Sequence, residues 1–216
     1  MGPNVDKLFL ELAGKPVVVH TWQVFAAARC VDEIIIVVRD GMQPVFEGLA
    51  KQFQIRSNFR LVVGGKERQD SVWNGLEAVS SDAGFVAIQD AARPCTSEAL
   101  IEATLAAARE TGAAVAAQPV TDTIKESADG KLVDRTLDRS KLWAVQTPQI
   151  FRLEILRCAL SEVRLRNLMV TDDTAACELI GQPVRLVAST DPNPKVTRAE
   201  DLPYIEMLLR RGPASR

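Results

Sequence analysis

Short apolar runs alternate along the chain with longer stretches in which apolar residues recur every three or four positions. Ile34–Val38 is a continuous β-branched run, typical of a strand buried on both faces. Similar runs predict further strands over 60–63, 85–88, 113–120 and 184–188. Helical periodicity predicts helices over 16–29, 42–54, 68–79, 97–111, 152–164, 172–180 and 199–211. This alternation predicts an α/β fold with an open, mostly parallel sheet.

Polar signatures follow two of the predicted strands directly. Gly64-Gly65 ends the strand at 60–63, and Asp90-Ala91-Ala92-Arg93-Pro94 ends the strand at 85–88. Open α/β sheets bind ligands in the crevice beyond the carboxyl ends of their strands. We therefore expect the functional site at this edge of the sheet.

The stretch 121–146 interrupts the alternation. It holds two short strand-like pieces around the turn Asp129-Gly130, and it carries Trp143. The pattern predicts a hairpin arm that projects from the sheet. Because an exposed tryptophan favours burial against another surface, we expect a partner subunit on this arm.

Composition and net charge exclude several classes of protein. Of 216 residues, 47% are apolar and 25% charged, so the chain can bury a core and is not disordered. The net charge of −2 offers no positive field for nucleic acid or an anionic membrane surface, and the apolar runs are too short to span a bilayer. Four scattered cysteines and a single histidine give no zinc-ligand spacing and no histidine-based triad, and they suit a reduced cytoplasmic protein.

Several residues permit a functional or a structural interpretation. Gly64-Gly65 with Ser71 could admit a ligand to the backbone or form a plain strand-to-helix turn. Asp90 could hold a hydroxyl or a metal and Arg93 a phosphate, or the two could pair with each other. Thr171-Asp172-Asp173 reads first as a helix N-cap. Taken alone, Lys7, Arg139 and Lys195 are equally compatible with surface charge, and His20 with a satisfied, partly buried side chain.

The ordered set of motifs resembles one family over about Met1 to Leu209. The motifs are Asp90-Ala91-Ala92-Arg93-Pro94, Asp122-Thr123, Asp138-Arg139 with Leu142-Trp143, Thr147-Pro148-Gln149, Thr171-Asp172-Asp173 and Lys195-Val196-Thr197. Together with Lys7 and Gly64-Gly65 through Ser71, they are similar to those of the 2-C-methyl-D-erythritol 4-phosphate cytidylyltransferases of the non-mevalonate isoprenoid pathway. Ribitol-5-phosphate cytidylyltransferase shares several of them and is the alternative.

The resemblance implies a Rossmann-like, GT-A-like nucleotidyltransferase fold, with residues 1–216 as one domain and 121–146 as a dimerisation arm. It implies a homodimer that joins CTP to a sugar-alcohol phosphate with Mg²⁺ and releases pyrophosphate. The attacking phosphate is already an anion at neutral pH, which suits a chain with one histidine. The resemblance gives no metal ligand.

The resemblance also implies a role for each matching residue. Lys7, Arg139 and Lys195 would be catalytic, with Lys7 at the α-phosphate and the other two on the incoming phosphate. Asp90, Arg93, Thr123 and Thr147 would bind the sugar phosphate, with Thr123 and Arg139 reaching across from the partner's arm. Gly65, Ser71 and Ala91 would line the cytidine pocket. Thr171 and Asp172 are expected to cap a helix.

The N-terminus departs from the family pattern. Met1-Gly2 align with the end of a glycine-rich loop that cradles the triphosphate, so the loop and its preceding strand are missing. That strand would be central, and its absence would expose two strand edges. We therefore expect a start upstream of Met1. If the loop is truly lacking, a catalytically silent dimeric relative is the second alternative.

Overall fold

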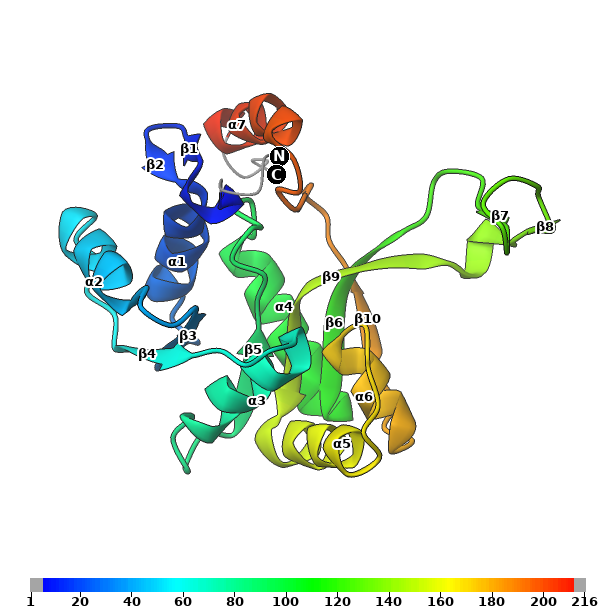
Figure 1. Ribbon diagram of the computed structural model, residues 1–216, viewed down its shortest axis with the longest axis horizontal. Coiled ribbons are helices and arrows are strands. Elements are labelled where there is room, and N and C mark those ends of the chain that lie inside the picture. Colours follow the sequence, from blue (N-terminus) through cyan, green and yellow to red (C-terminus); the bar gives the residue numbers. More distant parts are fainter. Residues whose placement is uncertain (1–5, 212–216) are drawn as a thin grey trace.

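The computed structural model describes residues 6–211 (Figure 1). Met1-Gly2, where the family pattern is broken, lie outside this range. No helix within it is both long and apolar enough to cross a bilayer. The strands are β1 (Glu11–Leu12), β2 (Lys15–Pro16), β3 (Ile34–Val38), β4 (Phe59–Val63), β5 (Phe85–Ile88), β6 (Ala113–Pro119), β7 (Lys125–Glu126), β8 (Arg135–Thr136), β9 (Trp143–Arg152) and β10 (Arg185–Ala188). The α-helices are α1 (Val17–Ala27), α2 (Gln43–Gln52), α3 (Arg68–Glu77), α4 (Glu98–Thr111), α5 (Leu153–Leu165), α6 (Asp173–Leu179) and α7 (Leu202–Arg211). Three 3₁₀ turns are η1 (Lys7–Phe9), η2 (Arg139–Lys141) and η3 (Ala199–Asp201).

The five strands predicted from apolar runs are confirmed as β3, β4, β5, β6 and β10, and the seven predicted helices as α1 to α7. Local signals explain why α4 begins and ends where it does. The Ser97 hydroxyl accepts a hydrogen bond from the Leu100 N–H at 3.3 Å, and Gly112 takes a left-handed conformation at φ +86°.

Strand β9 is the main element that the sequence did not predict. Its ten residues include Pro148, which normally argues against a central strand because it lacks an N–H. The structure accommodates it at an irregularity: Val145 pairs with Ala117 and Gln149 with Val115, so three residues of β9 lie opposite one of β6. Strand β9 therefore leads without interruption from the arm into the core.

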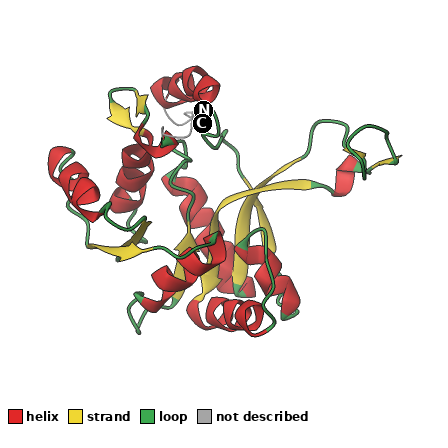
Figure 2. Cartoon of the chain, viewed as in Figure 1, coloured by secondary structure: helices red, strands yellow, loops and turns green. Residues whose placement is uncertain are grey.

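The main sheet has four strands in the order β10-β6-β9-β5. Strands β6 and β10 are parallel, and β9 runs antiparallel to both β6 and β5, so three of the four strands run in one direction and β9 alone makes the sheet mixed. Helix α4 packs on one face of this sheet, where its Ala108 lies against Ala114 of β6 and Ile150 of β9. The opposite face, with Ala113 and Phe151, packs against α5 and α6. Helices thus cover both faces, as Figure 2 shows.

Strands β3 and β4 form a separate parallel pair beneath α1 and α2. Their core includes Trp22, Phe46 and Phe59, whose rings meet at tilted or edge-on angles. Within residues 6–211, β3 pairs only with β4, and β5 only with β9. Each of these two strands therefore keeps one unpaired edge.

The projecting arm is confirmed. Strands β7 and β8 pair antiparallel around Asp129-Gly130, and the hairpin extends away from the sheet (Figure 1). Leu132 is 72% exposed and Val133 is 61% exposed at its tip. Trp143 and Val145 are exposed along its stem. The arm therefore presents apolar side chains that its own chain does not cover.

His20 is expected to make stability depend on pH in a predictable direction. Burial lowers the pKa of its imidazole, although the bond between Nε2 and the Leu12 carbonyl oxygen (2.6 Å) opposes this shift. A depressed histidine pKa means that the unfolded chain takes up a proton first as the pH falls. The stability is therefore complete above about pH 6.5 and declines below it.

Urea unfolding of the wild type and of His20→Gln between about pH 5 and about pH 8 measures this effect. The variant should lose the part of the pH slope that lies just below neutrality. Identical slopes in both proteins would assign the dependence to other groups.

Candidate active site

The turn after β5 brings an acid and a base together. The Arg93 N–H donates to the Asp90 carbonyl at 3.1 Å, which closes the turn, and Ala92 is buried beneath it. The Arg93 Nε lies 3.1 Å from the Asp90 Oδ2, and Lys195 Nζ lies 3.0 Å from the same oxygen. The pairing of Asp90 with Arg93 that the sequence allowed is present, and Lys195 joins it.

A buried asparagine holds the Lys195 loop against this turn. Asn193 is 2% exposed, and its Nδ2 donates to the Thr147 carbonyl at 2.8 Å. Its own carbonyl accepts from Arg93 Nη1 at 2.7 Å, and its Oδ1 accepts from the Thr96 hydroxyl at 3.1 Å. Sequence reasoning missed Asn193, since an asparagine beside a proline reads as an ordinary loop residue.

Replacing Asn193 with alanine is expected to lower the free energy of unfolding by about 2–3 kcal/mol, because buried partners lose their hydrogen bonds. Asn74→Ala is the matched control: its amide makes one bond, from Nδ2 to the Val63 carbonyl at 3.0 Å, nearer the surface. Urea unfolding compares the two variants. Equal losses of unfolding free energy in the two variants would show that the hydrogen bonds of Asn193 contribute no more to stability than the single bond of Asn74.

Thr147 connects β9 to the turn. Its hydroxyl accepts from the Asp90 N–H at 3.0 Å, and the residue is 3% exposed. Gln149 extends this hydrogen-bond network, because its Nε2 donates to Asp172 Oδ2 at 2.9 Å. Asp172 also accepts from the Ala175 N–H at 3.0 Å, which confirms it as the N-cap of α6. These bonds fix the Thr147-Pro148-Gln149 motif in place.

The cluster of Asp90, Arg93 and Lys195 carries a net positive charge. Burial disfavours the Asp90 carboxylate, but Lys195 and Arg93 outweigh that effect and hold its pKa below its usual value. One carboxylate thus faces two cations, and Lys195 is 38% exposed at its side chain. An anionic ligand could replace Asp90 as the partner of Lys195, so the arrangement suits a phosphate.

The Gly64-Gly65 turn brings backbone groups to the same edge. The Gly65 N–H donates to the Ser71 Oγ at 3.1 Å, and Ser71 in turn donates to the Glu67 carbonyl at 3.1 Å. A side chain at Gly65 would overlap Asp70, so this close approach requires glycine. Ser71 lines the same cavity as Asp90 and Ala91, which joins the two predicted motifs in one site.

Arg68, which is exposed, and the buried Asp173 form an ion pair beside this turn. Arg68 Nη2 lies 2.6 Å from Asp173 Oδ2, and the Asp173 side chain is fully buried. Burial raises the pKa of Asp173, although Arg68 opposes the shift. The bridge ties the start of α3 to the start of α6. The sequence placed both residues within motifs but gave no reason to pair them.

The residues that follow Lys7 pack close to the turn after β5. Leu8 and Leu10 pack in the apolar group that contains Ala92 and Val196. The Val196 N–H donates to the Ala92 carbonyl at 2.8 Å, so that group directly adjoins Arg93 and Lys195. The structure therefore places η1, with Lys7, next to the loops that carry the cluster.

Two predicted site residues lie on the projecting arm and not beside the turn after β5. Arg139 sits in η2, where its Nη1 donates to the Thr121 carbonyl at 2.6 Å, and Thr123 is exposed nearby. The arm that carries both extends away from the turn after β5 (Figure 1). Within one subunit, the described contacts do not join them to Asp90, Arg93 or Lys195.

Residues 6–211 contain no group of three histidine, cysteine, aspartate or glutamate side chains placed to hold a metal ion. Asp90 brings one carboxylate to the cluster, and cations already flank it. A divalent ion at this site would therefore take most of its ligands from a bound molecule, as Mg²⁺ commonly does with phosphates.

Comparison with known proteins gives consistent matches. The family described as "IspD: 2-C-methyl-D-erythritol 4-phosphate cytidylyltransferase" matches residues 1–211. A protein of that name from Pelotomaculum thermopropionicum is 41% identical over 97% of this chain and 89% of its own length. One from Bacillus velezensis is 41% identical over 97% of this chain and 90% of its own length.

Solved structures agree with these matches. The 4-diphosphocytidyl-2C-methyl-D-erythritol synthase from Anaerococcus prevotii superposes with a TM-score of 0.86 at 29% identity, over 94% of this chain and 93% of that one. The 2-C-methyl-D-erythritol 4-phosphate cytidylyltransferase from Thermus thermophilus gives a TM-score of 0.80 at 33% identity, over 94% of each chain. The similarity therefore extends over nearly the whole fold.

Proposed function

Because the chain belongs to the 2-C-methyl-D-erythritol 4-phosphate cytidylyltransferase family, we propose that it transfers CMP from CTP to 2-C-methyl-D-erythritol 4-phosphate. The products are 4-diphosphocytidyl-2-C-methyl-D-erythritol and pyrophosphate. The observation that carries the proposal is the cluster in which Lys195 and Arg93 share the Asp90 carboxylate at the carboxyl end of β5. The matches name the methylerythritol enzyme, so neither ribitol 5-phosphate as the substrate nor a silent relative is favoured.

In this reaction an oxygen of the sugar phosphate attacks the α-phosphorus of CTP. The new P–O bond forms as the bond between the α-phosphorus and the bridging oxygen of pyrophosphate breaks, and the electron pair leaves with pyrophosphate. The second pKa of a phosphate monoester is about 6, so the nucleophile is ionised without a general base. The main barrier is repulsion between anions, which positive charge and positioning overcome.

The residues of the cluster have complementary roles in this scheme. Lys195 leaves Asp90 to hold the incoming phosphate, and Lys7 stabilises charge at the α-phosphate. Asp90, Arg93 and Thr147 bind the sugar phosphate, since a carboxylate and a hydroxyl suit its hydroxyl groups. Support comes from the fixed geometry of the turn, in which the Asp90 N–H and the Thr147 hydroxyl are 3.0 Å apart.

The nucleotide would lie at the opposite side of the same crevice. Gly65, Ser71 and Ala91 line the cytidine pocket in this proposal. Ser71 and Ala91 border one cavity, and Gly65 is exposed beside Ser71, to which its N–H donates. Backbone groups at such a turn can select a base by its hydrogen-bonding edge.

A homodimer would complete the site. The domain spans residues 1–216 in this proposal, and its arm over 121–146 contacts the partner. Arg139 and Thr123 then reach the partner's Asp90 cluster, which neither can contact from its own body. The exposed Leu132, Val133 and Trp143 support the proposal, because a second subunit would bury them.

Mg²⁺ is part of the proposed reaction as an ion that arrives with CTP. It supplies charge neutralisation on the triphosphate when bound. Four free cysteines suit a reducing compartment, so we place the enzyme in the cytoplasm.

Pyrophosphate release tests the function directly. The chain is incubated with CTP and Mg²⁺, and with either 2-C-methyl-D-erythritol 4-phosphate or ribitol 5-phosphate. We expect release that depends on the methylerythritol compound. Release with ribitol 5-phosphate alone would make the alternative substrate correct. Folded protein that binds CTP but releases nothing with either compound would favour the silent relative.

A further inference from the structure

Thr21 makes a hydrogen bond that buried threonines in helices seldom make. It lies within α1 and is 4% exposed. The hydroxyl of a threonine inside a helix commonly donates to the carbonyl one turn earlier in the same helix. Thr104 of α4 does this, with its hydroxyl 2.7 Å from the Leu100 carbonyl oxygen. Thr21 instead donates to the Ala91 carbonyl at 2.9 Å, so α1 holds the turn after β5.

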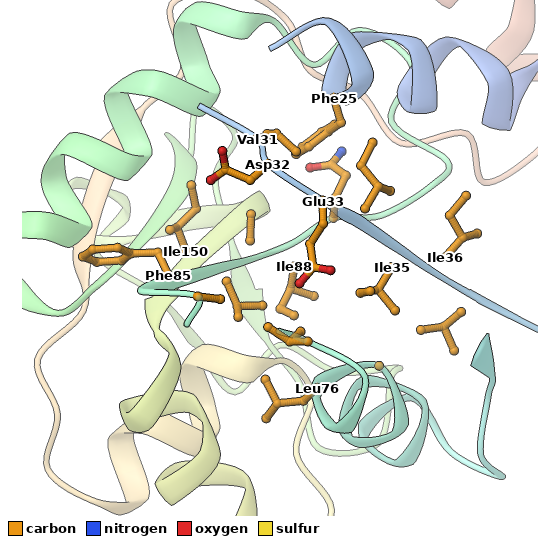
Figure 3. Close-up of a pocket in the computed structure, with 18 of the residues that line it drawn as sticks. Phe25, Val31, Asp32, Glu33, Ile35, Ile36, Leu76, Phe85, Ile88 and Ile150 are labelled. Atoms are coloured by element: carbon orange, nitrogen blue, oxygen red, sulfur yellow. The ribbon is translucent and has the colours of Figure 1, made fainter. Parts of the chain in front are cut away.

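Helix α1 is itself held firmly by packing. Val19 and Trp22 are buried in the core that α1 shares with α2 and β3. The cavity of the candidate site has α1 on one side and β5 on another, and Phe25 and Ile88 line it from these two elements (Figure 3). Because close-packed elements move little, a hydroxyl on α1 fixes the direction of the carbonyl to which it donates.

The Ala91 carbonyl belongs to the central peptide of a β-turn. The turn runs from Asp90 to Arg93 and is closed by the 3.1 Å bond from the Arg93 N–H to the Asp90 carbonyl. Type I and type II turns differ in the direction of this central peptide, and type II requires a positive φ at the third residue. Neither Ala91 nor Ala92 has a positive φ, so the turn is of type I.

The two ends of the turn are held independently of α1. The Asp90 carbonyl also accepts from Gln89 Nε2 at 3.2 Å, and the Ala92 carbonyl accepts from the Val196 N–H at 2.8 Å. Among residues 6–211, only Thr21 donates a hydrogen bond to the Ala91 carbonyl. Loss of this hydroxyl would therefore free the central peptide to rotate while both ends of the turn stay in place.

The direction of the central peptide decides which group faces a ligand. A peptide is planar and trans, so its C=O and N–H point in opposite directions. With the Ala91 carbonyl held at α1, the Ala92 N–H points away from α1 and offers a donor on that side. A reversed peptide would place the carbonyl oxygen there, and that oxygen would repel the phosphate oxygens of a nucleotide. Backbone N–H groups of fixed direction are common anion ligands.

We propose that Thr21 is a positioning residue for CTP, whose hydroxyl locks the peptide between Ala91 and Ala92 in the orientation that accepts the nucleotide. This role rests on the proposed function, which assigns Ala91 to the cytidine pocket. Thr21 acts through Ala91 and not on the reacting atoms. The sugar phosphate should be unaffected, because Asp90 keeps its bonds to Arg93 and Thr147.

Thr21→Val tests this role, because it keeps the branched shape of the side chain and removes the donor. We expect the KM for CTP to rise about tenfold, which corresponds to about 1.4 kcal/mol. The kcat and the KM for 2-C-methyl-D-erythritol 4-phosphate should stay at their wild-type values. A merely structural role would lower the fraction of folded enzyme, which reduces kcat and leaves the KM for CTP unchanged.

Two further variants serve as controls for Thr21→Val. Thr21→Ser keeps the hydroxyl donor, so its KM for CTP should return to that of the wild type. Thr104→Val also removes a buried hydroxyl, but the bond that it loses lies within α4. Its KM for CTP should equal that of the wild type.

NMR of the ligand-free wild type and Thr21→Val separates this role from the enzymatic function. A type I turn gives a strong NOE between the amide protons of Ala91 and Ala92. A reversed central peptide instead gives a strong NOE from the Ala91 Hα to the Ala92 amide proton. We expect the first pattern in the wild type and the appearance of the second in Thr21→Val. A wild type that releases no pyrophosphate would contradict the enzymatic function, and the NOE patterns would then decide the role of Thr21.

Four results would overturn the proposal. The first two are an unchanged KM for CTP in active Thr21→Val and a Thr21→Ser variant as impaired as Thr21→Val. The third is the type I NOE pattern alone in both proteins, because the central peptide would then keep its direction without the hydroxyl. The fourth is a fall in kcat with no change in the KM for CTP, which would reduce Thr21 to a structural residue.

Discussion

Replacing Lys195 with alanine is expected to lower kcat for pyrophosphate release about 10²- to 10³-fold, the range seen when one donor to a developing charge is lost. Lys195 Nζ lies 3.0 Å from Asp90 Oδ2 and is the more exposed of the two cations at that carboxylate. Its removal leaves Arg93 to neutralise Asp90, so little positive charge remains for the incoming phosphate.

Arg210→Ala is the matched control for this variant. Arg210 is also a cation beside an acidic side chain, at 2.6 Å from Glu206, but its side chain is 75% exposed on α7, away from the arm. We expect wild-type turnover from it. Turnover of Lys195→Ala close to that of Arg210→Ala would make Lys195 ordinary surface charge and would remove it from the mechanism.

Stability as a function of pH shows whether Lys195→Ala acts through charge. Burial raises the pKa of Asp90, while Lys195 and then Arg93 lower it further than burial raises it. A depressed aspartate pKa adds stability that is present at neutral pH and lost as the pH falls through the folded-state pKa. Without Lys195 this pKa rises toward its unfolded-state value, so Asp90 contributes less stability at neutral pH and less is lost on acidification. An unchanged acid limb would argue that the two groups are not coupled in solution.

Apolar periodicity predicted these helices and strands because the burial of one face requires apolar residues at a regular spacing. The apolar run Ile34–Val38 forms β3 as predicted, although only Val38 is fully buried, and Ser97 and Gly112 mark the ends of α4 by local hydrogen bonding and a positive φ. Strand β9 was missed because Pro148 gives a local signal against a strand. Its place in the sheet depends on pairing with β5 and β6, which are distant in sequence.

Some residues of the candidate site could likewise be predicted from the sequence, and others could not. Asp90, Arg93, Thr147 and Lys195 were found as motifs, and the structure brings them together. Asn193 and the pairing of Arg68 with Asp173 were not predicted, because a buried amide or ion pair depends on contacts between residues about a hundred positions apart. Sequence identifies residues that could bind a ligand more readily than those that position them.

Mixed dimers of two inactive variants test whether the arm completes a partner's site. Lys195→Ala removes a cation from the body of the domain, and Arg139→Ala removes one from the arm, where its present bond is to the Thr121 carbonyl. If each site combines one subunit's body with the other's arm, a heterodimer has one site with both defects and one with neither. Random mixing of the two variants should then restore about a quarter of wild-type activity.

The result separates a shared site from two independent ones. Arg139 is exposed on the arm, so its replacement should leave the free energy of unfolding within about 0.5 kcal/mol of wild type. A site built within one subunit would carry one defect in every copy, and mixing would restore nothing. Subunits must be exchanged by mild denaturation and refolding, with each variant alone treated identically as the control. Recovery that needs both variants would show that the arm acts across the dimer, because neither chain by itself then supplies both cations to one phosphate.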